Sequence, residues 1–279
     1  MGLVRFSLSF PAEYDILFLV IQMMIIIAPA KRMRGSIDFM DAEQEPVFLN
    51  QSRQLLRYLK TKTCKELQSM LGCNTAIAQW AYDSYQHMEL TSSGVPALLS
   101  FDGIQYSYMA PDLFSDEYFA YARKHLRILS GLYGILRPFD AVVPYRLELD
   151  SPVHTDFCTS LYEFWGKQPY DELIHEDKEL LDLSSKQYGK LIKKHLDEQV
   201  HCVTVYFLEE EDGKRREKGV YVKMARGEMV RWLAEENIQS FEAVKGFCRL
   251  GYRFDAQASD DTAYHFVRTG PWKRNKKLM

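Results

Sequence analysis

The sequence feature that most constrains the fold is an apolar run close to the start of the chain. Residues 16–27 read ILFLVIQMMIII, and the sequence Ala-Pro-Ala follows. The run is shorter than the roughly 20 residues that a membrane-spanning helix needs. Acidic residues just before it and Gln22 within it are not typical of a secretory signal peptide. We therefore predict that residues 24–28 form a buried strand, which leaves its sheet at Pro29.

The overall composition is that of an ordinary globular protein. The chain has 279 residues, of which 47% are hydrophobic and 26% are charged, and a chain of this size can bury a large core without disulfides or metal ions. A net charge of −3 excludes a uniformly basic, histone-like protein, although a local basic patch suffices for binding nucleic acid. Because we find no flexible linker and no internal repeat, we expect one domain.

The cysteines predict free thiols. Five cysteines stand at positions 64, 73, 158, 202 and 248, which is an odd number, and none forms a C-x-x-C pair. This usage is typical of a reducing compartment, and the ligand spacing of zinc and iron–sulfur sites is missing. We therefore expect a cytoplasmic protein without structural disulfides, bound metal or another cofactor.

Three short helices are predicted between residues 50 and 88. Asn50 or Ser52 is expected to cap the first, and Gly72 to end the second. Asn74 is expected to cap the third, whose apolar residues lie at near-helical spacing and would point inward. These apolar residues are Ile77, Trp80, Ala81, Tyr85 and Met88.

The remaining elements predict an α/β (mixed α+β) fold, a single compact domain with a central mixed sheet and surrounding helices. Ser115 caps a helix over residues 115–129, which ends at Ser130-Gly131, and another helix begins at Arg226-Gly227. An acidic turn joins two of the predicted strands into a hairpin. Strands are expected at residues 24–28, 97–101, 200–208, 220–224 and 264–267.

Several sequence blocks resemble the YaaA family of peroxide stress proteins, and they cover about residues 24–268. The strongest block is HLRILSGLYGILRPFDAVVPYRLE at residues 125–148. The other matching blocks are MIIIAPAKRM at 24–33, LSFDGIQYSYM at 99–109, LYEFWG at 161–166, VKMARG at 222–227 and KGFCRLGYRFD at 245–255. Their number and order identify the chain as a member of this family.

The resemblance also divides the chain into three parts, and the sequence departs from the family pattern at two places. Residues 1–23 are expected to be an extension outside the family sequence, 24–270 the family domain and 271–279 a basic tail. Ala28 replaces the serine usual in the family, and VKMARG has one cation fewer than the usual A-K-K-A-R-G.

The family resemblance implies a function without an established catalytic reaction. It implies resistance to hydrogen peroxide, restraint of free iron, and binding of DNA through a positively charged cleft and a helix-hairpin-helix. We therefore expect a DNA-binding protein of the oxidative stress response, with duplex or branched DNA contacted through its phosphate backbone and with no membrane partner. The oligomeric state stays open.

The segment 130–134, SGLYG, is the candidate for the helix-hairpin-helix. It follows the predicted helix and precedes a possible second helix near Ile135. Backbone N–H groups near Gly131 and Gly134 would bind a phosphate. One extra residue separates these glycines, and Pro138 limits the second helix. The alternative is a helix end packed into the core.

Cations in the family blocks are the other DNA-binding candidates. Arginine suits phosphate oxygens because its guanidinium donates in a planar fork. We expect the set to line one cleft, although each member alone would also fit a surface ion pair. The set is Lys31, Arg127, Arg137, Arg146, Lys223, Arg226 and Arg231. Five aromatic residues would stack on bases or pack in the core: Tyr106, Tyr133, Tyr145, Trp165 and Tyr252.

The alternative function is an enzyme acting on a nucleotide or nucleobase in the same cleft. No zinc-protease, hydrolase, Walker A or dinucleotide-binding motif is present. Glu148 or Glu163 would then act as a general acid or base, whereas the simpler role of Glu148 is to orient Arg146. A DNA-binding protein predicts a cleft as wide as a duplex; an enzyme predicts a narrow pocket where Lys31, Arg146, Glu148 and Arg226 converge. A third possibility, an iron-binding protein, is not supported because the sequence lacks the spacing of iron ligands. We expect His125 to have a structural role.

Overall fold

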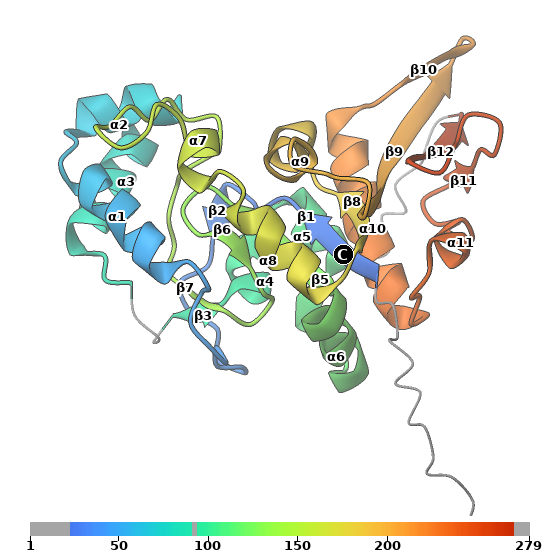
Figure 1. The fold of residues 1–279 in the computed structure, drawn as a ribbon, viewed down its shortest axis with the longest axis horizontal. Helices are drawn as coiled ribbons and strands as arrows, with labels where there is room; N and C mark the ends of the chain where they lie inside the picture. Colours follow the sequence, from blue (N-terminus) through green and yellow to red (C-terminus); the bar gives the residue numbers. More distant parts are fainter. Residues whose placement is uncertain (1–22, 91–93, 271–279) are drawn as a thin grey trace, which may run out of the picture.

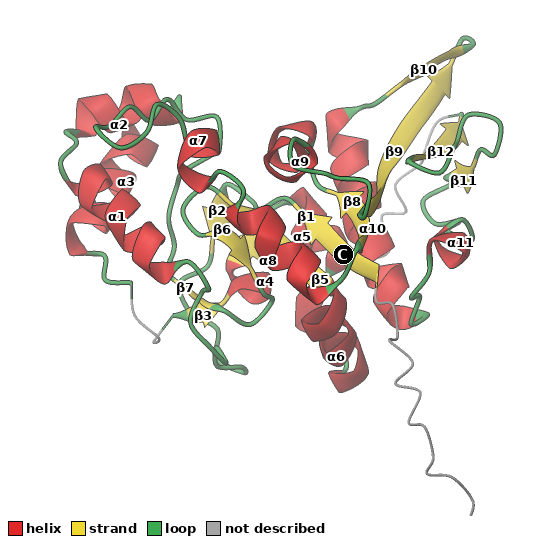
Figure 2. Cartoon of the chain, viewed as in Figure 1, coloured by secondary structure: helices red, strands yellow, loops and turns green. Residues whose placement is uncertain are grey.

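An eight-stranded mixed sheet forms the centre of the chain, which confirms the expected fold class (Figure 2). The computed structural model describes residues 23–90 and 94–270, so residues 1–22 and the basic tail lie outside it. The strands of this sheet are β1 (Met23–Ile27), β5 (Leu126–Ser130), β6 (Gly134–Leu136), β8 (Glu179–Leu183), β9 (His201–Glu211), β10 (Lys214–Arg216), β11 (Arg253–Phe254) and β12 (Ala263–Thr269). Two small sheets pair β2 (Arg32–Met33) with β4 (Phe101–Asp102) and β3 (Val95–Pro96) with β7 (Ala141–Val142).

The order of the parallel strands fixes where a ligand site can form. The sheet runs β11-β12-β9-β8-β1-β5-β6, with β10 on the edge of β9, and the strands from β12 to β5 are parallel. Successive parallel strands along the chain are added first on the β5 side of β1 and then on its β8 side. Ligands of open α/β sheets bind at the carboxyl ends of the strands at such a switch point. Here the switch point lies between β1 and β8.

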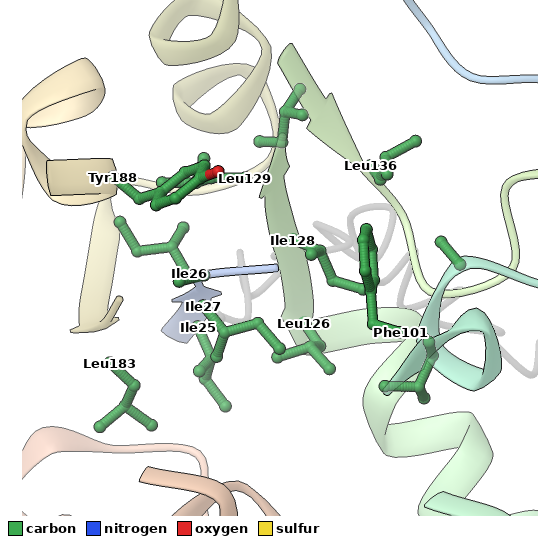
Figure 3. Packing of buried hydrophobic residues seen from close by; sticks show 14 of the residues in the cluster. Ile25, Ile26, Ile27, Phe101, Leu126, Ile128, Leu129, Leu136, Leu183 and Tyr188 are labelled. Carbon is green, nitrogen blue, oxygen red and sulfur yellow. The ribbon is translucent and has the colours of Figure 1, made fainter. Parts of the chain in front are cut away.

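Strand β1 is the predicted buried strand. All five of its residues are at most 1% exposed, and Ile25 pairs with Leu126 of β5 and Leu181 of β8. Figure 3 shows the β1 isoleucines packed between side chains of β5 and β8. The strand starts at Met23, one residue before the predicted start, so Met23 belongs to the core and not to the expected extension.

Helices surround the sheet (Figure 1). In Figure 1 the first three gather at one end of the molecule, while the β9–β10 hairpin projects at the other. Gly72, Asn74 and Ser115 have the predicted capping roles. The helices are α1 (Leu49–Lys60), α2 (Cys64–Leu71), α3 (Thr75–His87), α4 (Ala97–Ser100), α5 (Ile104–Met109), α6 (Asp116–His125), α7 (Leu161–Trp165), α8 (Gln168–Glu176), α9 (Lys186–Lys193), α10 (Gly219–Glu235) and α11 (Phe241–Val244), with a 3₁₀ turn at Pro111–Leu113. Within residues 23–90 and 94–270, no helix has both the length and the hydropathy needed to cross a bilayer.

The segment predicted as a helix-hairpin-helix is a β-hairpin. Helix α6 ends at His125, and the chain continues directly into β5 and then β6. All five residues of β5 are buried because the strand lies inside the sheet, whereas a surface helix would bury one stripe only. Gly134 has a φ of +72°, and the Tyr133 N–H donates to Ser130 Oγ in the turn. The second helix expected near Ile135 is therefore wrong.

Three other local predictions are also wrong. Residues 97–101 are mainly helix α4, and its four residues are all buried; periodicity cannot separate such a run from a buried strand. Asp212 and Gly213 have positive φ and form a two-residue turn, so β10 begins directly after it and pairs with β9. Residues 220–224, which were predicted as the returning strand, belong to helix α10 instead. Phe48, rather than Asn50 or Ser52, precedes α1.

Close packing of α10 against α5 generates a stability prediction. A Cβ at Gly227 would lie 2.0 Å from the backbone oxygen of Gln105. Gly227→Ala should therefore lower the free energy of unfolding by at least about 1–3 kcal/mol, the usual cost of overpacking. Urea denaturation measures this change. Gly219→Ala, in open space on the same helix, should not destabilise, and equal effects of the two substitutions would contradict the packing shown.

Candidate anion-binding cavity

A cavity of about 410 Å³ opens at the switch point of the sheet. Residues 28–31, which follow β1, form one part of its wall, and Ser185, Gln187 and Tyr188, which follow β8, form another. Helices α5 and α10 and the segment 145–148 complete it. This volume lies in the range of small-molecule sites, which is about 300–1,000 Å³. The topology thus brings together segments that lie far apart in the sequence.

Positive charge dominates the lining of this cavity. Five cationic residues and two carboxylates contribute to it. Arg32 lies 3.2 Å from Asp102, and Lys223 and Arg226 are three residues apart on α10 and so share a face. Helix α9 also begins here, with its positive end toward the cavity. The cationic residues are Lys31, Arg32, Arg146, Lys223 and Arg226.

Glu148 lies between two of these cations. Its Oε1 atom is 2.6 Å from Arg146 Nε and 3.3 Å from Lys31 Nζ. Arg146 and Glu148 are each 9% exposed, whereas the Lys31 side chain is mostly in solvent. The contact between Arg146 and Glu148 is close but lacks hydrogen-bond geometry. Glu148 therefore holds Arg146 and Lys31 by charge.

Buried polar atoms without hydrogen-bond partners gather at this cavity. Within residues 23–90 and 94–270, seven buried side-chain atoms lack a partner, and five of them belong to lining residues. Native proteins pair nearly all such atoms, so each exception needs a reason. Of the five, Arg146 Nε and Glu148 Oε1 lie 2.6 Å apart as an ion pair, and a ligand that accepts hydrogen bonds would supply partners for the other three. The five atoms are Gln105 Nε2, Arg146 Nε, Glu148 Oε1, Gln187 Nε2 and Arg226 Nε.

Arg226 enters the cavity wall from a half-buried position on α10. Burial lowers the pKa of its guanidinium, and the nearby Asp182 carboxylate partly offsets this effect. An arginine stays charged even so. Asp182 is already paired with Lys193 at 2.7 Å and accepts from Ser184. The Arg226 charge is therefore available to a ligand.

Tyrosine hydroxyls fix the backbone of the cavity wall. The Tyr85 hydroxyl, on α3, donates to the carbonyl of Arg146, and the Tyr106 hydroxyl, on α5, donates to the carbonyl of Ala28 at 3.1 Å. Burial raises the pKa of both phenols, so they remain protonated donors. Of the five aromatic residues considered for stacking, Tyr106 and Tyr145 line the cavity; Tyr133, Trp165 and Tyr252 are buried in the core.

Three of the cations predicted for one cleft lie outside the cavity lining. Each is engaged in an ion pair with a neighbouring carboxylate, and Arg127 is almost fully buried in β5. The fold therefore brings four of the seven predicted cations to this cavity and pairs the other three with carboxylates outside its lining. The pairs are Arg127–Glu176, Arg137–Asp140 and Arg231–Glu235.

Gly131 and Gly134 are buried packing positions and do not line the cavity. A Cβ at Gly131 would lie 2.2 Å from the backbone oxygen of Leu147, and one at Gly134 would lie 2.8 Å from the ring of Trp165. The Trp165 indole donates to the Gly131 carbonyl at 3.0 Å. These glycines let neighbouring segments approach closely. This agrees with the alternative that the segment packs into the core, except that the segment is the turn of a β-hairpin and not the end of a helix.

The other predicted residues have local roles. Glu163 accepts from the backbone N–H of Thr159 at 2.8 Å in the first turn of α7. His125 is buried, with a ring nitrogen 3.0 Å from the Met23 carbonyl oxygen. In the described part of the chain, no three His, Cys, Asp or Glu side chains are placed to hold a metal ion, and all five cysteines are free.

Sequence reasoning missed several lining residues. Arg32 follows Lys31 directly, and Gln105 lies in a block that matched the family, so both had a signal in the sequence. Gln187 and Tyr188 had none, because only the sheet order brings the start of α9 to the end of β1.

Comparison with known proteins identifies the family. A family model described as peroxide stress protein YaaA matches residues 23–258. The chain belongs to this family. The match begins at the first residue of β1 and includes every segment that lines the cavity. Membership supports a role of this YaaA-family protein in the response to oxidative stress.

Curated relatives cover almost the same region. The UPF0246 protein of Desulfitobacterium hafniense (strain Y51) is 50% identical over 246 residues, which are 88% of this chain and 98% of the relative. The UPF0246 protein of Lachnoclostridium phytofermentans is 42% identical over 255 residues, 91% of this chain and 100% of the relative. The UPF0246 protein of Lactobacillus johnsonii is 43% identical over 244 residues, which are 88% of this chain and 97% of the relative.

The hydrogen bond of Tyr85 generates a prediction for the cavity wall. Tyr85→Phe leaves the buried Arg146 carbonyl without this donor, which should lower the free energy of unfolding by about 1–3 kcal/mol. Urea denaturation measures the loss. Tyr82→Phe is the control on the same helix, since the Tyr82 hydroxyl shows no hydrogen bond to any described residue. A Tyr85→Phe protein as stable as the control would contradict this bracing role.

Proposed function

We propose that the cavity binds a phosphorylated ligand of about the size of one nucleotide, as part of the oxidative stress role of the family. The observation that supports this most directly is the group of five buried polar atoms without partners around one cationic cavity. Four of the five belong to side chains that donate hydrogen bonds. Phosphate oxygens are acceptors and anionic, so they match both features.

Each part of the cavity has a role in this proposal. Arg146 and Arg226 donate to phosphate oxygens, and Lys223 adds charge at the exposed side. The amide of Gln105 is 7% exposed and supplies a neutral donor from α5. Glu148 holds Arg146 and Lys31 in place. Because its carboxylate is engaged with two cations, a positioning role for Glu148 is favoured over general acid or base catalysis.

DNA binding is the second candidate, and a neighbouring cavity favours it. This second cavity has a volume of about 460 Å³ and shares four residues with the first. The backbone of one strand that passed from one cavity to the other would contact the cations that line both. Cavities of this size admit nucleotide units rather than a duplex, so we propose single-stranded or opened DNA as the target. The shared residues are Lys31, Arg32, Asp102 and Arg146.

Two arginines on one helix test the phosphate site. Arg226→Met should weaken binding of pyrophosphate and of thymidine 5′-monophosphate by roughly 10- to 100-fold, because a hydrogen bond to a charged group contributes about 1.5–3 kcal/mol. Isothermal titration calorimetry measures both affinities, after circular dichroism has shown that the variant folds. Arg231→Met is the matched control, since Arg231 is paired with Glu235 outside the cavity. Equal affinities of the two variants would exclude the site.

Salt dependence tests the DNA candidate separately. Binding of an oligothymidylate should weaken with salt, with a log–log slope of about −0.7 for each phosphate neutralised on a single strand. Removing the Arg226 charge should flatten this slope by about that amount. Fluorescence anisotropy at several salt concentrations gives the slopes. The candidate fails if a duplex of the same length binds as tightly as the single strand, or if Arg226→Met leaves the slope unchanged.

A further inference from the structure

The second cavity has an apolar wall opposite its cations. Helix α3 supplies this wall through Ala76, Ile77 and Trp80, and the polar residue Asn74, which caps the helix, also lines the cavity. Trp80 is 43% exposed, although the periodicity of α3 predicts an inward side chain. A large aromatic ring exposed beside a cavity often contacts a ligand. Without a ligand, the protein would be more stable with such a ring buried in its core.

The structure of α3 holds Trp80 in a fixed place beside the cations. Ile77 and Trp80 are three residues apart and therefore share a face of the helix. The opposite face is anchored in the core, where Ala78, Ala81 and Tyr85 are fully buried. Tyr85 also donates to the Arg146 carbonyl. One helix thus connects the exposed indole rigidly to the backbone of a cavity arginine.

The residues common to both cavities indicate how one ligand would occupy them. Lys31 and Arg146 line the first cavity and the second, so a phosphate bound by them lies beside the apolar wall of α3. A nucleotide combines the same two features, because its anionic phosphate adjoins a flat and weakly polar base. Every base has a π-face that stacks on an aromatic ring, whatever its hydrogen-bonding edge.

We propose that Trp80 is the stacking platform of a nucleobase subsite, with Ile77 beside it, and that the cations shared by the two cavities bind the adjoining phosphate. The proposal rests on the phosphate site proposed above and adds the chemical class of the ligand. The base belongs either to a free nucleotide or to a nucleotide of a single strand, and the same stacking recognises both.

A comparison of three ligands tests this subsite. The probes are thymidine 5′-monophosphate, 2-deoxyribose 5-phosphate, which lacks the base, and an oligothymidylate. Trp80→Ala should weaken binding of at least one base-containing probe by roughly 5- to 150-fold, which corresponds to the range measured for stacking on one base. It should leave 2-deoxyribose 5-phosphate unchanged, because the phosphate site remains. Trp80→Phe should restore most of the affinity, since a smaller ring still stacks.

The outcomes separate the subsite from the phosphate site. A loss with the mononucleotide supports a free nucleotide as the ligand, and a loss with the oligomer alone supports a single strand. Unchanged affinity for both base-containing probes overturns the subsite while the phosphate site stands. If 2-deoxyribose 5-phosphate loses affinity equally, Trp80 acts on the fold and not on the base. If wild-type protein binds none of the probes, the proposed function itself fails. Leu113→Ala, at an exposed apolar residue outside both cavities, is the control.

Discussion

The burial of β1 between two parallel neighbours is the constraint on which both the sheet and the cavity depend. Its side chains pack against β5 on one edge and β8 on the other, and burial of each such aliphatic side chain contributes about 1.5–3 kcal/mol. Strand β1 contains no charged residue, and the first cations after it, Lys31 and Arg32, lie just beyond its end. Because β8 adjoins β1 at the switch point, the start of α9 faces those cations. Core packing thereby sets the position of the polar site.

Two buried ion pairs in this protein differ in how completely hydrogen bonds within the protein satisfy them. Arg268 donates from Nε and Nη2 to Glu209 at 3.0 and 2.9 Å, and the Tyr252 hydroxyl also donates to Glu209. The Arg146–Glu148 pair is similarly buried but leaves atoms of both partners without a directed hydrogen bond. Burial of charge is costly unless hydrogen bonds compensate for lost hydration. A bound anion would accept hydrogen bonds from Arg146 alone, whereas the first pair has its hydrogen bonds within the protein.

Local sequence patterns were sufficient for β1 and for the caps of α3 and α6. The blocks that resemble the family held four of the cations at the cavity, together with three that lie elsewhere. Local patterns failed at residues 126–136, because leucine and isoleucine at this spacing fit a helix stripe and a buried strand equally well, and the glycines there resemble a helix end. Trp80 fitted the inward stripe of α3, yet the helix packs against the rest of the protein on its other face. Gln187 reaches the cavity through the sheet order alone, which no local pattern contains.

The distribution of charge favours an anionic ligand small enough to enter the cavity. The chain is net negative by three charges, while the cavity has three more cationic than anionic side chains. The rest of the surface therefore repels a long polyanion except where it meets this cavity, and a local positive field in a concave site attracts small anions most strongly. An extended duplex would have to approach that acidic surface over its whole length. A nucleotide of the proposed kind, or one strand, would meet the positive field of the cavity, so the charges that favour this proposal also favour a small or narrow ligand.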